Sequence, residues 1–114
     1  MARVLVIAEA PLGRLVSWIL EDAGHWTRWI DDPAVGVTAC AAIEPNVVVI
    51  NGAVPAEEMP AYEASLSAAA PGVRVIDVSH QAGAPTADVP ADAHLTQPFH
   101  ADDLLAAVER LQHT

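Results

Sequence analysis

Apolar and polar residues follow two different periods along this chain. Short continuous apolar runs alternate with longer stretches in which apolar residues recur every three or four positions. The runs are typical of strands buried on both faces, and the longer stretches are typical of amphipathic helices. This alternation predicts βαβ units built around a parallel sheet. Strands are expected at Arg3–Ala8, Trp26–Ile30, Val47–Ile50, Val73–Ser79 and Ala93–Thr96.

Helix ends are marked by proline, glycine and capping residues. Asp32 before Pro33 is an N-cap followed by a proline at the first helical position, and Gly24 suits a helix stop. In the first predicted helix, six apolar positions share the expected core face: Leu12, Leu15, Val16, Ile19, Leu20 and Ala23. Helices are expected at about Pro11–Ala23, Asp32–Ile43, Glu57–Ala70 and Ala101–Leu111.

The stretch from His80 to Asp92 breaks the pattern. Gly83, Pro85 and Pro90 leave room for at most one short helical turn there. Five strands with right-handed crossovers predict a doubly wound α/β sheet, formed by one domain over residues 1–114. In such sheets the functional groups lie at the carboxyl ends of the strands. These ends carry Ala8, Glu9, Asn51, Ser79 and Gln97.

Charge and composition narrow the function classes. The net charge is -10, and all basic residues are arginines, so direct binding of nucleic acid by this domain is not expected. No apolar run approaches the roughly 20 residues that span a membrane, and no secretory signal is recognisable. The single cysteine, Cys40, is expected to be a small core residue and fits a reducing, cytoplasmic compartment.

Four segments of the chain have a characteristic order and spacing. They are Arg3-Val4-Leu5-Val6-Ile7-Ala8-Glu9, Ile19-Leu20-Glu21-Asp22-Ala23-Gly24-His25, Pro45-Asn46-Val47-Val48-Val49-Ile50-Asn51 and the most telling one, Leu95-Thr96-Gln97-Pro98-Phe99. Together they resemble receiver domains of two-component response regulators, and the resemblance covers nearly the whole chain. It implies a flavodoxin-like sheet with strand order 2-1-3-4-5 and, here, a fourth helix that is shortened or missing.

The family transfers a phosphoryl group to an aspartate at the end of the third strand. The resemblance places Asn51 at this acceptor position, and a neutral amide cannot form the acyl phosphate. The acidic pair that helps to bind magnesium falls on Ala8 and Glu9, so one carboxylate is missing. The lysine position falls on Gln97, while Ser79 retains the hydroxyl. The aromatic switch position falls on His94.

These replacements are mutually consistent with a degenerate phosphorylation pocket. We therefore expect a phosphorylation-independent signalling or protein-interaction module of a two-component-type pathway, with no catalytic residue, no cofactor and no metal. Its partner would be another protein or a tethered output domain, with a homodimer as a further option. Two alternatives remain: a small-ligand or metal sensor that uses the vacated pocket, and an unusual phosphoacceptor at Ser79.

Other polar and aromatic residues have competing interpretations. Asp77 either forms a replacement polar site under Asn51 or reaches the sheet margin or a loop amide. Trp18, Trp26 and Trp29 are expected to be core or half-core residues, with a partner-binding patch as the alternative. A transition-metal site is a minor alternative to solvated side chains at the rim of the sheet, and its candidate ligands are Glu9, His80, His94 and His100.

Overall fold

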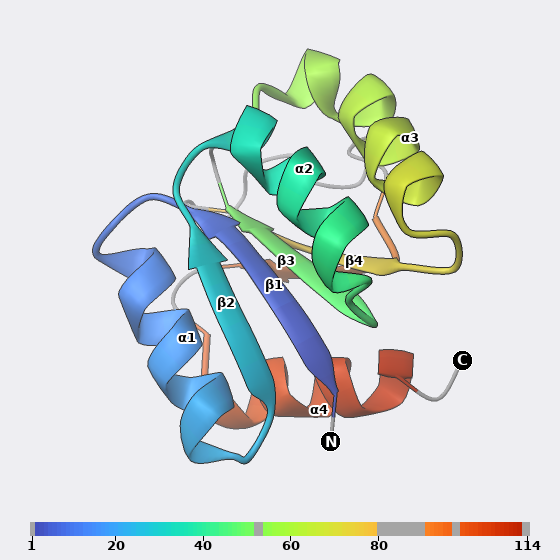
Figure 1. Cartoon of the computed structure of the whole chain (residues 1–114). Helices are drawn as coiled ribbons and strands as arrows, with labels where there is room; N and C mark the ends of the chain where they lie inside the picture. The colour runs from blue at the N-terminus through green and yellow to red at the C-terminus, as the bar shows by residue number, and fades with distance from the viewer. Residues whose placement is uncertain (1, 52–53, 80–90, 97–98, 113–114) are drawn as a thin grey trace.

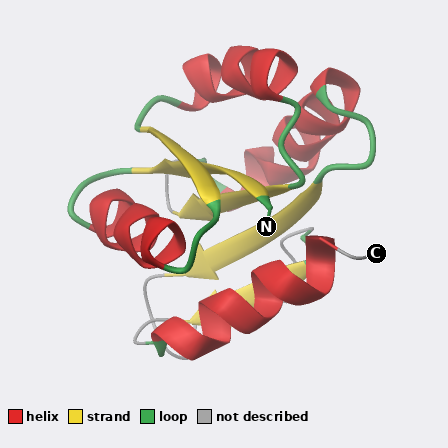
Figure 2. Ribbon diagram, turned by 60° about the horizontal axis from the view of Figure 1, so that its bottom comes forward, coloured by secondary structure: helices red, strands yellow, loops and turns green. Residues whose placement is uncertain are grey.

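The apolar runs form a five-stranded sheet, and helices cover both of its faces. The computed structural model describes residues 2–51, 54–79, 91–96 and 99–112. Helices α2 and α3 lie on one face, and α1 and α4 lie on the other (Figure 1). Figure 2 shows the three layers edge-on. The elements are β1 (Arg3–Ala8), α1 (Leu12–Asp22), β2 (Trp26–Ile30), α2 (Pro33–Ile43), β3 (Val47–Asn51), a 3₁₀ turn (Ala56–Glu58), α3 (Met59–Ala69), β4 (Arg74–Ser79), β5 (Ala93–Thr96) and α4 (Ala101–Gln112).

All neighbouring strands are parallel, in the order β2-β1-β3-β4-β5. This confirms the expected strand order and the doubly wound α/β architecture. The order reverses direction between β1 and β3, so the helices that follow these two strands lie on opposite faces. Because every strand is parallel, all the carboxyl ends meet at one edge of the sheet.

Alternate residues of each strand face alternate layers. In β1, Val4 and Val6 pack against α1 and α4, whereas Leu5 and Ile7 pack against α2 and α3. All four side chains are fully buried. The continuous apolar run of β1 is therefore explained by burial on both faces, as in other parallel sheets.

The predicted helix boundaries agree with the structure to within one or two residues. Asp32 caps α2 as expected: its Oδ1 accepts hydrogen bonds from the backbone nitrogens of Ala34 and Val35, at 2.9 and 3.4 Å. The described residues contain four α-helices. The expectation that the helix between β4 and β5 is shortened or missing concerns residues 80–90, which lie outside the described ranges.

The core prediction was wrong for three large side chains. Leu15 is 49% exposed, Trp18 is 65% exposed and Trp26 is 44% exposed. The buried stripe of α1 is narrower than the apolar pattern suggested, so Leu15 and Trp18 fall on its outer side. Trp26 is the first residue of the edge strand β2. An edge strand has a neighbour on one side only, which leaves this indole open to solvent.

The remaining predictions about single residues have clear outcomes. Cys40 is fully buried in the core between the sheet and helices α2 and α3, which confirms its structural role. Burial raises the pKa of its thiol, which disfavours the reactive thiolate. Within the described ranges, no helix combines the length and the apolar character needed to cross a membrane.

Candidate functional site at the carboxyl ends of the strands

The sheet register brings the ends of the central strands together. Ala8 pairs with Asn51 across β1 and β3, and Asn51 pairs with Val78 across β3 and β4. Ser79 follows Val78 and ends β4. Glu9 comes directly after β1, while Gln97 lies outside the described residues. Four of the five positions identified from the sequence therefore lie on β1, β3 and β4 or directly beyond them.

Asn51 is buried and held by a short hydrogen bond. Asn51 is only 3% exposed, and its side-chain amide Nδ2 donates a 2.6 Å hydrogen bond to the backbone oxygen of Val78. Only the nitrogen side of the amide can face this carbonyl, because an oxygen there would place two acceptors in contact. The side chain thus links β3 to β4 through a donor that an ionised aspartate lacks.

Ala8 is enclosed at the end of β1. Its side chain is 1% exposed and belongs to the apolar core under α1 and α4. Its backbone oxygen accepts a 2.7 Å hydrogen bond from the indole Nε1 of Trp29. The indole also lies so close to Gly13 that a Cβ at this position would overlap the ring. Trp29 therefore closes the space between the end of β1 and the first turn of α1.

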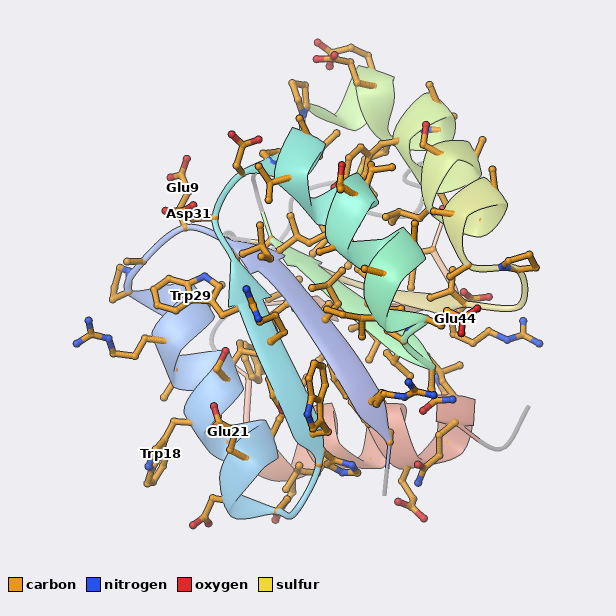
Figure 3. All side chains as sticks on the ribbon, in the orientation of Figure 1. Glu9, Trp18, Glu21, Trp29, Asp31 and Glu44 are labelled. Carbon is orange, nitrogen blue, oxygen red and sulfur yellow. The ribbon has the colours of Figure 1, made fainter. Side chains whose placement is uncertain are left out.

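Acidic residues occupy the outer rim of this region. Glu9 and Asp31 follow β1 and β2 directly, and both residues are exposed (Figure 3). Of the two positions that the resemblance assigns to the acidic pair, Glu9 carries a carboxylate and Ala8 does not.

Asp77 contacts a histidine on the neighbouring strand. Its Oδ2 lies 3.7 Å from Nδ1 of His94, and the two residues pair across β4 and β5. By strand alternation Asp77 shares a face with Val75, toward α2 and α3, whereas Asn51 faces the other layer. The idea of a replacement site under Asn51 is therefore wrong. Among the described residues, the contact of the Asp77 carboxylate is with His94 on the edge strand β5.

Burial raises the pKa of the Asp77 carboxyl, and His94 partly offsets the increase. A second carboxyl near this pair behaves similarly. The pKa of Glu63 on α3 is raised by burial and by Asp92, while His94 opposes the shift. Asp92 itself accepts a 2.8 Å hydrogen bond from the backbone nitrogen of Val75. The α3 side of the sheet therefore carries a group of interacting acids around His94.

The minor hypothesis of a transition-metal site finds no support in the described ranges. There, no three His, Cys, Asp or Glu side chains are grouped so that they could hold a metal ion. His94 is engaged with Asp77, and His100 is exposed at the start of α4. His80 lies outside the described residues.

Trp29 was not recognised from the sequence as part of the site. Strand alternation predicts that Trp26 and Trp29 lie on different faces of β2, and Trp29 packs against the core under α1 and α4. The spacing of residues does not reveal that one indole would reach the carbonyl of Ala8. Gly13, in the first turn of an amphipathic helix, is the residue whose small size permits this approach.

Comparison with known proteins gives different results at the levels of sequence and structure. No family model matches the sequence, and no match was found among curated proteins. Solved structures match over nearly the full length. The chain is 26% identical to NtrX from Brucella abortus in complex with ATP, with a TM-score of 0.84. This match covers 98% of the chain but only 26% of NtrX.

Two isolated receiver domains match over almost their whole length. One is a CheY-like receiver domain protein from Methanospirillum hungatei, with 19% identity, a TM-score of 0.82 and coverage of 99% of this chain and 94% of that one. The other is the receiver domain of a sensor histidine kinase from Pseudomonas aeruginosa, which has a magnesium ion coordinated in its active-site cleft. It is 16% identical, with a TM-score of 0.77, and the match covers 99% and 98% of the two chains. Together with the sheet order and the two helical layers, these matches show that the chain has the CheY-like fold of response-regulator receiver domains.

Proposed function

We propose that this domain is a phosphorylation-independent receiver that works as a protein-interaction module in two-component-type signalling. The observation that carries the proposal is the state of Asn51. The residue at the acceptor position is a neutral amide, it is buried, and its Nδ2 is bound to the oxygen of Val78. A neutral amide lacks the negative charge of a carboxylate and is a much weaker nucleophile toward phosphorus.

The surroundings of Asn51 do not fit the magnesium ion that receiver chemistry uses. Magnesium prefers several hard oxygen ligands in octahedral geometry. Ala8 offers no side-chain oxygen, and its backbone oxygen is already bound by Trp29. Glu9 is left as a single exposed carboxylate. These features support the loss of metal-dependent phosphoryl transfer, and we assign no enzymatic activity to the domain.

Binding to a protein partner, or to a tethered output domain, is supported by the exposed aromatic surface. Trp18 points away from the body of the molecule on the outer side of α1 (Figure 3). Together with Leu15, one turn earlier, it presents an apolar strip to solvent. Exposed tryptophans are frequent energetic centres of protein interfaces. A homodimer through this strip is the alternative use of the same surface.

A small-ligand sensor that uses the vacated pocket has weaker support. Ala8 and Asn51 are both buried, and their backbone or side-chain polar groups are engaged by Trp29 and Val78. The alternative of a phosphoacceptor at Ser79 rests on the sequence alone. A cytoplasmic location is proposed from the expected signalling role.

The proposal is tested by amide NMR during addition of magnesium and then beryllofluoride, a mimic of the phosphoryl group. We expect the backbone signals of Glu9 and Asn51 to stay fixed at millimolar magnesium and in beryllofluoride. A receiver that retains the aspartate and lysine, taken through the same additions, serves as the positive control. Saturable movement of either signal would contradict phosphorylation independence.

A further inference from the structure

A groove opens between the first turns of α2 and α3, on the face of the sheet that these helices cover. Its volume is about 600 Å³. Most of its wall is apolar, from Pro33 at the start of α2, the loop residues Val54 and Pro55, and Ala61 and Tyr62 of α3. None of these residues belongs to the positions assigned to the phosphorylation pocket.

Tyr62 gives the groove a fixed aromatic wall. Its hydroxyl donates a 2.6 Å hydrogen bond to the backbone oxygen of Pro33, which ties α3 to the beginning of α2. Burial is the main cause that raises the pKa of this phenol to about 12, followed by Cys40 and Asp32. The hydroxyl is therefore neutral and already engaged at physiological pH. What Tyr62 offers to a ligand is therefore its aromatic ring.

Among the described residues, the charged ones that line the groove are acidic. Glu57 and Glu58 line it and are exposed, and Asp32 lies close enough to affect Tyr62. No arginine lines the groove, although the chain has five arginines and no lysine. The groove thus combines prolines and an aromatic ring with carboxylates that no basic residue of its lining neutralises.

We propose that this groove binds an arginine or lysine side chain from an extended basic segment of a partner protein. The aliphatic stem of such a side chain fits the proline and tyrosine wall, while its charged end meets Glu57 and Glu58. Long basic side chains bury their stems on apolar surfaces in this way, and a cation near a tyrosine face gains further attraction. The net charge of -10 draws a basic partner toward the domain.

This inference rests on the proposed role as an interaction module and names the chemistry of the partner. The test is an NMR titration with the capped tripeptide acetyl-Leu-Arg-Leu-amide. Its matched control is the same peptide with citrulline, a neutral isostere of arginine, at the centre. We expect saturable shifts of the Val54, Glu57, Glu58 and Tyr62 amides, with a Kd on the order of 1 mM for the arginine peptide and about tenfold weaker binding of the citrulline peptide.

Two double variants test whether peptide binding depends on the acids of the groove or only on the net negative charge of the domain. The variant Glu57→Gln/Glu58→Gln is expected to weaken binding of the arginine peptide about tenfold. The variant Glu21→Gln/Asp22→Asn removes the same charge from the exposed end of α1 and should leave binding unchanged. All four side chains are exposed, so both variants are expected to fold. Fluorescence and circular dichroism of each variant check this before the titration.

Equal binding of the two peptides, equal weakening by both variants, shifts confined to other surfaces or no saturable shift would each overturn the proposal. Failure here is distinguishable from failure of the proposed function. If the groove does not bind the arginine peptide and beryllofluoride has no effect, only the proposed binding site is wrong. If the groove binds the peptide and the domain responds to beryllofluoride, the binding site stands and phosphorylation independence is wrong.

Discussion

The polar groups on the two faces of this sheet differ in their charge and in their hydrogen bonding. On the side of α1 and α4, the side-chain hydrogen bonds at the strand ends join neutral groups: Asn51 donates to Val78, and Trp29 donates to Ala8. On the side of α2 and α3, the polar groups are largely acids. Asp77 is buried beside His94 across the strands, while Glu57 and Glu58 remain open at the groove.

This difference separates the strand-end hydrogen bonds that stabilise the fold from the exposed acids at the groove, for which we propose a binding role. An amide or indole N–H that donates to a backbone oxygen inside the protein adds stability. The same N–H is then not available to a ligand. An exposed carboxylate adds little to stability but keeps its charge for an incoming cation. We therefore expect substitutions on the side of α1 and α4 to change the free energy of unfolding. Substitutions on the side of α2 and α3 should instead change its pH dependence or the binding of a partner.

The largest effect is expected for Asn51→Asp, which introduces the carboxylate that the resemblance to receiver domains implies at this position. The new carboxylate would face the Val78 oxygen without a donor and in a buried position. We expect a loss of about 3 kcal/mol in the free energy of unfolding at neutral pH. Chemical denaturation followed by fluorescence measures the loss.

Asn51→Ala is the control for Asn51→Asp, since it removes the hydrogen bond without adding charge. It should lose less, about 1–2 kcal/mol. If Asn51→Asp were as stable as the wild type and responded to beryllofluoride, the pocket would still be poised for phosphorylation, and the contrast between the two faces would not hold.

A smaller effect is expected for Trp29→Phe. The phenyl ring retains most of the apolar contact but leaves the Ala8 oxygen without its indole donor. We expect a loss of about 1 kcal/mol in the free energy of unfolding. Trp18→Phe is the matched control on the exposed side of α1 and should change stability by less than about 0.5 kcal/mol. Equal losses in the two variants would show that the hydrogen bond to Ala8 does not distinguish the two tryptophans.

The sequence was sufficient to predict the sheet because the strand pattern is unusually clean. The run from Val47 to Ile50 has no polar interruption, and Asp32-Pro33 marks a helix start with two independent signals. Both features act locally along the chain, so composition and spacing reveal them. The strand order came from the resemblance to receiver domains, because the pairing of distant strands has no local signature.

The site was predictable only in part, because its key contacts join residues that are far apart in sequence. Asn51 was identified through the family pattern, but its bond to Val78 depends on the register between β3 and β4. The indole of Trp29 on β2 donates to the backbone oxygen of Ala8 on the neighbouring strand β1. Trp18 was misplaced for a related reason: an apolar residue on an amphipathic helix does not show how wide the buried stripe is.

On the α2 and α3 side, Asp77→Asn is expected to change how the free energy of unfolding depends on pH. The carboxyl pKa in the folded state is raised from its usual value of 3.8, mainly by burial. The wild-type fold is therefore favoured below this value and loses that advantage as pH rises through the raised pKa. Asp77→Asn removes the titration, so its stability should fall less between pH 3 and 7. Urea denaturation across this range measures the slope.

Asp102→Asn, which alters an exposed residue of α4, is the control for this slope. Glu63→Gln should flatten the profile in the same direction as Asp77→Asn, because burial and Asp92 raise its pKa as well. The same pH slope in Asp77→Asn and in the wild type would mean that Asp77 does not carry the buried charge on this face.

The smallest effect on stability is expected for Glu57→Gln/Glu58→Gln. These carboxylates precede the first turn of α3, where a negative charge interacts favourably with the helix dipole. Their removal should reduce the free energy of unfolding by about 0.5 kcal/mol, and less at high salt, because exposed charges are screened. Thermal and urea denaturation, beside Glu21→Gln/Asp22→Asn, measure the difference. A loss close to that of Asn51→Asp would mean that these acids hold the fold together, and the groove could then no longer be regarded as a surface that is free to receive a basic partner.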